Sequence, residues 1–341
     1  MSAALVSYAQ RFEDLYLMRC LGGREGFYLD IGSGHPVHDN VSFAFYLKGW
    51  SGLTVEPNPR LARLTRAVRR RDRHVEALVG AAAGEATFYL VNDFHGLSTM
   101  IAGHARAAQT RFGKSSEPLT VPVTTLKDLC AQHVPPRFDF LKVDVEGAER
   151  DVLLNGDWQN YRPRIVVVEA LAPYTLAPAW EAWEPFLAGH GYRQVWFDGL
   201  NRYYLAEEAD ELRSCFEAAP ASFDDVIQFR HVKPALIDPS HPDHRLATLL
   251  ARTAMAELPL LGIDVLVGLV TADMTPAMLD KPASAEDVAR ALERLLGPDA
   301  TLSRADLRLS LRPQLRDVYA ALVDSDQFRA ACGRISASYA W

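Results

Sequence analysis

The chain has 341 residues, of which 49% are hydrophobic and 23% are charged, and its formal net charge is −7. This length and composition predict a globular protein with one large domain and an appended region. The acidic balance and the scattered basic residues lack the electrostatic footprint of a nucleic-acid-binding protein, so we expect no nucleic-acid partner.

Three further features favour a cytoplasmic protein. The first residues, MSAALVSYAQRFED, contain neither a basic segment nor an apolar core, so we expect no signal peptide. The most apolar run, at 258–270, is too short to span a bilayer and contains Asp264. The four cysteines form no close pair in the sequence, which favours reduced thiols. We therefore expect a cytoplasmic protein without a transmembrane segment.

A glycine-rich turn follows the first predicted strand, as in nucleotide-binding α/β folds. The segment FYLDI at 27–31 is apolar and contains Asp30, and Gly32, Ser33 and Gly34 come directly after it. The glycines allow a sharp turn and let a ligand approach the bare backbone. Strand and turn together predict the start of a nucleotide-binding α/β unit.

A helix is expected after this turn, starting from Asn40 or Ser42, with N-terminal amides that attract an anionic group. The dinucleotide fingerprint G-x-G-x-x-G is not met, because Val37 stands where the third glycine belongs. The turn therefore favours a ligand with a ribose and an amino-acid tail over a pyrophosphate.

The second predicted strand, in GLTVEPNP at 52–59, places Glu56 at its carboxyl end. An acid at this place in a doubly wound fold can accept both hydroxyls of a ribose. The alternative is a solvated strand end before a proline turn. The glycine turn upstream favours the ribose interpretation.

Apolar strands and helices alternate through the next part of the chain. Because helices separate the strands, we expect a mostly parallel, doubly wound α/β sheet, closed by an antiparallel terminal hairpin. The predicted segments are strands at 73–82, 85–91 and 164–170, an extended segment running into a helix at 119–130, a strand, acidic turn and helix at 138–156, a helix at 179–191 and the hairpin at 193–206.

The proline-rich segment at 231–244 indicates a linker, so we expect one domain at 1–235 and a helical accessory domain at 236–341. Apolar residues recur there at three- and four-residue spacing, without a catalytic constellation. We expect this part to serve docking or dimerisation, including a homo-oligomer through its helices. A substrate-presenting lid is the alternative.

Four sequence blocks together resemble the FkbM family of S-adenosylmethionine-dependent methyltransferases. They are SYAQRFEDLYL, GFYLDIGSGHPVHDNVSFAFYLKGWSGLTVEPNP, FDFLKVDVEGAERDVLLNGDW and WFDGLNRYYL, in order over about residues 7 to 230. The resemblance implies a class I, Rossmann-like methyltransferase with S-adenosylmethionine as cofactor. Members with known substrates methylate hydroxyl oxygens of sugars or natural products, which implies a small-molecule or glycan acceptor.

Under this resemblance the glycine turn holds the methionine and ribose portion of S-adenosylmethionine. Ligands of doubly wound sheets lie outside the carboxyl ends of the strands, where several acids are expected to converge. The expected cofactor-binding residues are Asp30, Gly32, Ser33, Gly34, Glu56, Pro57, Asn58 and Asp144.

A base or a metal must help a sugar hydroxyl to act as a nucleophile. We expect the base among the strand-end acids Asp144, Glu146 and Glu169, with the loop histidines His35 and His95 as further candidates. Glu146 can instead be a first-turn helix acid. Magnesium held by carboxylates is the minor alternative, because no metal-spacing motif supports it.

These observations predict an S-adenosylmethionine-dependent O-methyltransferase that acts on a sugar, glycan or glycosylated natural product. One alternative is a non-catalytic cofactor-binding component of a glycan-assembly complex. The paired acids of DVEGAE argue against it, because a binding module does not need them. A Rossmann oxidoreductase is the other alternative, weakened by Val37 and the terminal hairpin.

Overall fold

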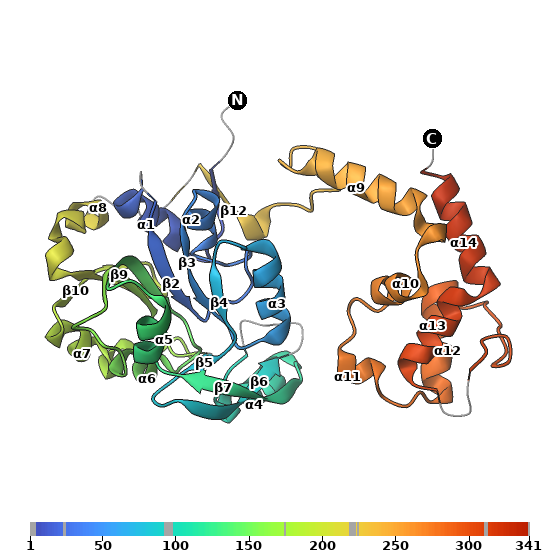
Figure 1. The fold of residues 1–341 in the computed structure, drawn as a ribbon, viewed down its shortest axis with the longest axis horizontal. Helices are drawn as coiled ribbons and strands as arrows, with labels where there is room; N and C mark the ends of the chain where they lie inside the picture. The colour runs from blue at the N-terminus through green and yellow to red at the C-terminus, as the bar shows by residue number, and fades with distance from the viewer. Residues whose placement is uncertain are drawn as a thin grey trace. The chain divides into compact units, whose positions relative to one another are not determined.

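The computed structural model describes residues 5–22, 25–91, 98–173, 175–217, 223, 225–309 and 313–339. The chain forms two compact units, residues 1–232 and 233–341 (Figure 1). Among the described residues, no helix combines the length and the apolarity needed to span a bilayer.

A mostly parallel sheet forms the centre of the first unit and confirms the predicted doubly wound fold. Its strands are, in spatial order, β10 (Tyr192–Phe197), β11 (Asn201–Ala206), β9 (Arg162–Glu169), β8 (Arg137–Val143), β2 (Phe27–Ile31), β3 (Ser51–Val55) and β4 (Arg73–Val75). β9, β8, β2, β3 and β4 run parallel, whereas β11 pairs antiparallel with β9 and β10 antiparallel with β11. The hairpin at 193–206 is thus confirmed as the antiparallel edge.

A second, smaller sheet departs from the prediction. It contains β5 (Leu78–Val79), β7 (Ser116–Thr124) and β6 (Gly84–Val91), in that spatial order. The segment at 73–82, expected to be one strand, is divided between the two sheets. β6 pairs antiparallel with β7 along its whole length, from Gly84 to Val91. The segment expected as a strand at 85–91 therefore has its partner outside the main sheet. A short parallel pair, β1 (Leu5–Ser7) with β12 (Val226–Gln228), joins the two ends of the unit.

Helices cover the main sheet, and their apolar residues share its core. Leu17, Leu129, Val152 and Leu187, from four different helices, are buried in the same cluster as the strand residues. The helices of this unit are α1 (Glu13–Leu21), α2 (Phe43–Leu47), α3 (Pro59–Val68), α4 (Ala102–Phe112), α5 (Leu126–His133), α6 (Glu149–Leu154), α7 (Glu184–Gly189) and α8 (Arg213–Glu217). The helix expected at 179–191 is shorter than predicted, because a 3₁₀ turn at Trp180–Ala182 precedes α7.

The second unit is helical, as the sequence predicts, and has its own core around Val318 and Leu322. Its helices are α9 (His244–Ala256), α10 (Ile263–Val270), α11 (Pro276–Leu279), α12 (Ala285–Leu296), α13 (Leu315–Asp324) and α14 (Asp326–Ala337). Ser284 caps α12 in a capping box with Asp287, which explains why this helix begins at Ala285.

Candidate active site

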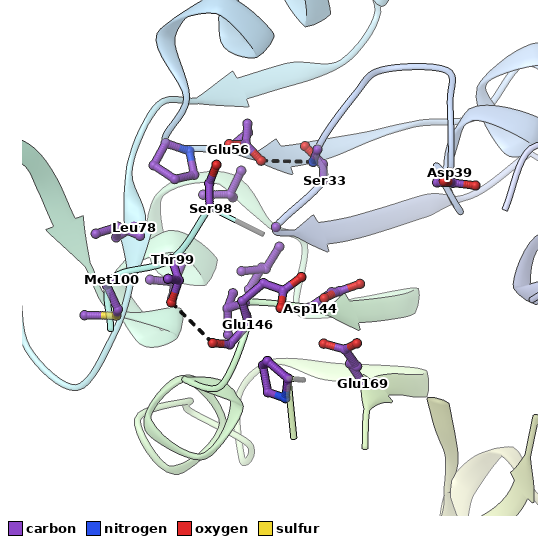
Figure 2. Close-up of a pocket in the computed structure, with 18 of the residues that line it drawn as sticks. Ser33, Asp39, Glu56, Leu78, Ser98, Thr99, Met100, Asp144, Glu146 and Glu169 are labelled. Carbon is purple, nitrogen blue, oxygen red and sulfur yellow. Dashed lines mark hydrogen bonds between the residues drawn. The ribbon is translucent and has the colours of Figure 1, made fainter. Parts of the chain in front are cut away.

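A cavity of about 610 Å³ lies at the carboxyl ends of β2, β3, β8 and β9 (Figure 2). Its walls are the turns that follow these strands, together with residues of the small sheet and the segment at 98–100. Every residue that lines it belongs to the first unit. This is the place where doubly wound sheets bind their ligands.

The glycine turn after β2 forms one wall, and its two glycines have different functions. Gly32 has φ +74°, and a Cβ atom there would lie 1.6 Å from the carbonyl oxygen of Asp144. The turns after β2 and β8 therefore approach each other through this glycine. Gly34 has φ +58°, and a Cβ atom there would meet nothing within 4 Å. The hydroxyl of Ser33 is buried and has no hydrogen-bond partner among the described residues.

Glu56 lies beside this turn, at the end of β3, and its side chain is buried. Its Oε2 accepts a hydrogen bond from the Gly34 N–H at 3.0 Å, and its Oε1 accepts one from the Asn58 N–H at 2.9 Å. Burial raises the pKa of Glu56 to about 7. Each carboxylate oxygen has a further lone pair for a ligand donor.

Two of the expected cofactor-binding residues belong to the scaffold instead. Asp30 Oδ2 accepts a hydrogen bond from the Ser42 hydroxyl at 2.5 Å, and Asn58 Oδ1 caps α3 by accepting from the Arg60 N–H at 3.0 Å. Neither Asp30 nor Asn58 lines the cavity, whereas Pro57 does. The direction of each side chain, which the sequence did not reveal, determines whether the residue lines the cavity.

The helix start that was expected to attract an anion also lies outside the cavity. α2 has only five residues, and Asn40 Oδ1 already accepts a hydrogen bond from the Phe43 N–H at 2.8 Å. Neither residue lines the cavity. The expectation that this helix start attracts an anionic ligand is therefore wrong. The Asn40 side chain, and not a ligand, accepts the hydrogen bond of the Phe43 N–H.

Three carboxylates converge on the opposite wall. One oxygen each from Asp144, Glu146 and Glu169 lies within 4.8 Å of the others, and Figure 2 shows the three side chains side by side. The extended geometry of β8 ends at Val143, and Glu146 has φ +54°. The side chains of Asp144 and Glu146 are thus positioned by this turn and not by strand alternation. Both line the same cavity.

Burial and mutual repulsion dominate the electrostatics of this cluster. Burial, followed by the charge of Asp144, raises the pKa values of Glu146 and Glu169 well above their usual range. Oε2 of Glu169 is buried and has no hydrogen-bond partner among the described residues. A buried acceptor at a cavity wall indicates a ligand that donates a hydrogen bond or a proton.

The same oxygen spacing suits a divalent cation such as magnesium, which prefers carboxylate ligands. A positive charge is already present beside the cluster, because Nζ of Lys142 donates a hydrogen bond to Asp144 Oδ2 at 3.1 Å. The cluster can therefore bind a proton or a cation, and a chelator experiment separates the two.

Glu149, and not Glu146, is the acid at the start of α6. Glu149 Oε1 accepts hydrogen bonds from the N–H groups of Val145 and Gly147, both at 3.1 Å. The sequence interpretation had considered Glu146 for this position. Glu146 precedes the helix and faces the cavity, which leaves it available for chemistry.

The two candidate histidines differ in what can be said of them. His35 lines the cavity, but its Nδ1 accepts hydrogen bonds from the N–H groups of Val37 at 3.1 Å and His38 at 3.0 Å. This nitrogen holds the turn together and is a poor candidate for a base. His95 lies outside the described residues.

Comparison with known protein families decides the class of protein. Residues 30–194 match the model of the methyltransferase FkbM domain. The chain carries an FkbM methyltransferase domain. The resemblance seen in the sequence blocks is thereby confirmed, and the protein is a methyltransferase. A search of the curated proteins finds no match to this sequence.

Solved methyltransferases are distant neighbours of the FkbM domain. A TehB-like SAM-dependent methyltransferase from Corynebacterium glutamicum is 11% identical with a TM-score of 0.33, and the match covers 57% of this chain and 87% of that one. Precorrin-6y C5,15-methyltransferase from Geobacter metallireducens is 14% identical with a TM-score of 0.32, over 57% and 89%. The bifunctional kinase-methyltransferase WbdD is 14% identical with a TM-score of 0.31, over 57% and 37%. Similarity this low indicates no substrate.

Sequence reasoning missed several residues of the FkbM domain that form or support the cavity. Leu78 and Phe88 come from the small sheet, and Thr99 Oγ1 donates a hydrogen bond to the carbonyl oxygen of Glu146 at 3.4 Å (Figure 2). Lys142 was missed as well, although its position two residues before Asp144 on a strand places both on one face. The small sheet itself could not be found, because pairing partners are not visible in an isolated strand.

Proposed function

We propose that the FkbM domain transfers a methyl group from S-adenosylmethionine to a hydroxyl oxygen of a sugar, a glycan or a glycosylated natural product. The observation that carries this proposal is the buried Oε2 of Glu169, which has no hydrogen-bond partner among the described residues and belongs to a cluster of carboxylates at the cavity wall. Such a carboxylate oxygen is suited to receive the proton of a hydroxyl group.

The wall around the glycine turn fits S-adenosylmethionine. The Ser33 hydroxyl lacks a partner among the described residues, and Gly34 presents bare backbone to open space, so both can meet a polar ligand. Glu56 can accept ribose hydroxyls with its remaining lone pairs. Leu78 and Phe88 provide an apolar wall suited to an adenine ring.

When bound, S-adenosylmethionine would supply a methyl group carried on a sulfonium sulfur. In the transfer the acceptor oxygen bonds to the methyl carbon, the C–S bond breaks, and the sulfur keeps its electron pair. Glu169 Oε2 accepts the hydroxyl proton, so the oxygen can attack. Asp144 and Glu146 raise the proton affinity of Glu169. Because the pKa values of Glu146 and Glu169 are raised, the cluster must first lose its own proton. We therefore expect the transfer rate to rise with increasing pH.

The carboxylate cluster also favours a polyhydroxylated acceptor. Neighbouring hydroxyl groups of a sugar can donate hydrogen bonds to several carboxylates at once, whereas an apolar acceptor would leave these groups unpaired. The resemblance of the four sequence blocks to sugar-modifying FkbM proteins supports the same class of acceptor.

Two measurements test this function. Titration calorimetry with S-adenosylmethionine, S-adenosylhomocysteine and NAD should show binding of the first two, and binding of NAD alone would favour the oxidoreductase. The protein is then incubated with methyl-labelled S-adenosylmethionine and a panel of free and nucleotide-activated hexoses. Mass spectrometry should find the label as an O-methyl group. Cofactor binding without transfer, combined with unchanged surface glycans in cells that lack the gene, would favour the non-catalytic alternative.

A chelator arm decides between the proton and metal interpretations of the cluster. The proposed mechanism predicts that EDTA leaves methyl transfer unchanged. Loss of transfer with EDTA, restored by added magnesium, would show that the carboxylates hold a metal ion instead.

A further inference from the structure

A buried lysine lies directly behind the carboxylate cluster. Lys142, on β8, is only 3% exposed. Its Nζ donates hydrogen bonds to Asp144 Oδ2 at 3.1 Å and to Asn201 Oδ1 at 3.0 Å. It therefore connects the catalytic wall with the antiparallel strand β11.

Asn201 extends this connection to helix α1. Its Nδ2 donates hydrogen bonds to Glu13 Oε1 at 2.8 Å and to Asp198 Oδ2 at 3.2 Å. The hydroxyl of Tyr203 donates to the same Asp198 oxygen at 2.8 Å. Asn201 and Glu13 are both buried, so the network is shielded from solvent.

Acidic groups from several elements surround the Lys142 ammonium. Burial alone would lower the pKa of Lys142, but the charges of Asp144, Glu13 and Glu169 raise it above its usual value. The ammonium is therefore charged at neutral pH. The acidic groups around it are Asp144 and Glu146 after β8, Glu169 on β9, Asp30 on β2, Glu13 on α1 and, through Asn201, Asp198 before β11.

We propose that Lys142 is a positioning residue for methyl transfer: anchored by Asn201, it holds Asp144 in place and supplies the positive charge that lets the carboxylate cluster ionise and accept the acceptor's proton. This inference rests on the proposed role of the cluster as base. Lys142 does not line the cavity, so it acts through Asp144 and not on the substrate.

A purely structural lysine would behave differently. Buried ion pairs are weak evidence of stabilisation, and breaking one leaves an uncompensated charge. A loss of stability on substitution therefore does not identify the role. The titration of the neighbouring carboxylates does, because a nearby positive charge favours their ionised form.

The experiment compares wild type with Lys142→Met, Glu13→Gln and the control Lys127→Met, which removes an exposed lysine from α5. NMR of isotope-labelled side-chain carboxyl carbons follows the titration of Glu146 and Glu169 in the full chain, with Glu146→Gln and Glu169→Gln assigning the signals. Titration calorimetry with S-adenosylmethionine and circular dichroism report on the cofactor site and the fold.

The proposal predicts shifts of opposite sign. Lys142→Met should raise the carboxylate pKa values, because the neighbouring cation is lost. Glu13→Gln should lower them by less, because glutamine can still accept from Asn201 but carries no charge. Burial, followed by the charge of Asp198, raises the pKa of Glu13 to about 7, so this smaller effect should be clearest at alkaline pH. Lys127→Met should change nothing.

Unchanged titration in a folded Lys142→Met variant would overturn the proposal. If that variant does not fold, Lys142→Gln, which removes the charge but keeps a hydrogen-bonding side chain, decides, and unchanged carboxylate titration there would overturn the proposal as well. The proposed function is tested separately: a wild-type protein that does not bind S-adenosylmethionine would contradict that function, whatever the titration shows.

Discussion

The two walls of the cavity differ in how well their polar groups are satisfied. At the wall formed after β2 and β3, the buried Glu56 accepts two backbone hydrogen bonds. At the wall formed after β8 and β9, three carboxylates converge, and Oε2 of Glu169 has no hydrogen-bond partner among the described residues.

This difference suggests that one wall holds the cofactor and the other meets the acceptor substrate. Unsatisfied buried polar groups are unfavourable for folding and are typical of sites that meet a ligand. A wall whose acids are already bonded is rigid and suited to hold a cofactor in one place. The Ser33 hydroxyl is the exception on that wall, and it is placed where a ligand can satisfy it.

The largest expected effect is at the point where the two walls touch. Gly32→Ala should destabilise the protein by at least about 3 kcal/mol, because left-handed backbone and a clash with the Asp144 carbonyl oxygen both oppose a Cβ atom. Gly34→Ala is the matched control, with the same sign of φ but open space, and should cost about 1–2 kcal/mol. Chemical denaturation measures both. Equal losses would show that the contact between the walls is not tight.

The second effect concerns the unsatisfied wall. Asp144→Asn, Glu146→Gln and Glu169→Gln should each lower single-turnover methyl transfer by roughly a hundredfold or more, with little change in cofactor affinity. Asp151→Asn is the control, because Asp151 is an exposed acid on α6 that pairs with the exposed Arg150, and its substitution should affect stability by under about 1 kcal/mol and turnover not at all. Full activity in the three variants would show that none of these carboxylates is the catalytic base.

The third effect concerns the satisfied wall. Glu56→Ala should cost about 2 kcal/mol of S-adenosylmethionine binding, because hydrogen bonds to a charged group are the stronger kind. This corresponds to roughly thirtyfold weaker affinity. Titration calorimetry measures it. Unchanged affinity would place Glu56 outside the cofactor site.

The pH dependence of binding gives a smaller effect at the same residue. Burial raises the pKa of Glu56 to about 7, and ribose hydroxyls donate to its ionised form. Affinity for S-adenosylmethionine should therefore rise severalfold as the pH increases through about 7, and then level off. Glu56→Gln should abolish this dependence. A wild-type affinity that falls with increasing pH would contradict the assignment.

The smallest expected effect is on removal of the second unit. All residues that line the cavity precede Lys233, so a chain that ends at Val232 should fold and bind S-adenosylmethionine with unchanged affinity. Size-exclusion chromatography of both chains would show whether the helical unit mediates self-association. An insoluble or molten product would show that the two walls depend on the helical unit.

The sequence was most informative where a feature depends on neighbouring residues. Strand ends, the glycine turn and the acids at 144, 146 and 169 could be predicted, because strand periodicity and turn chemistry are local. The FkbM family was identified from the same blocks and is confirmed. The division of 73–82 between two sheets was not predicted, since sheet membership depends on a partner elsewhere in the chain.

The sequence by itself determined the class of protein, the positions of most strands along the chain and the acids available at their ends. Tertiary structure decided which acids face the cavity: Asp30 is bonded to Ser42, while Glu146, in the left-handed conformation, lies beside Glu169. It also decided that Lys142 meets Asn201, which in turn reaches Glu13 across 188 positions. The physical reason is that such contacts arise only when the sheet and α1 pack together, and no local pattern encodes which distant side chains will then meet.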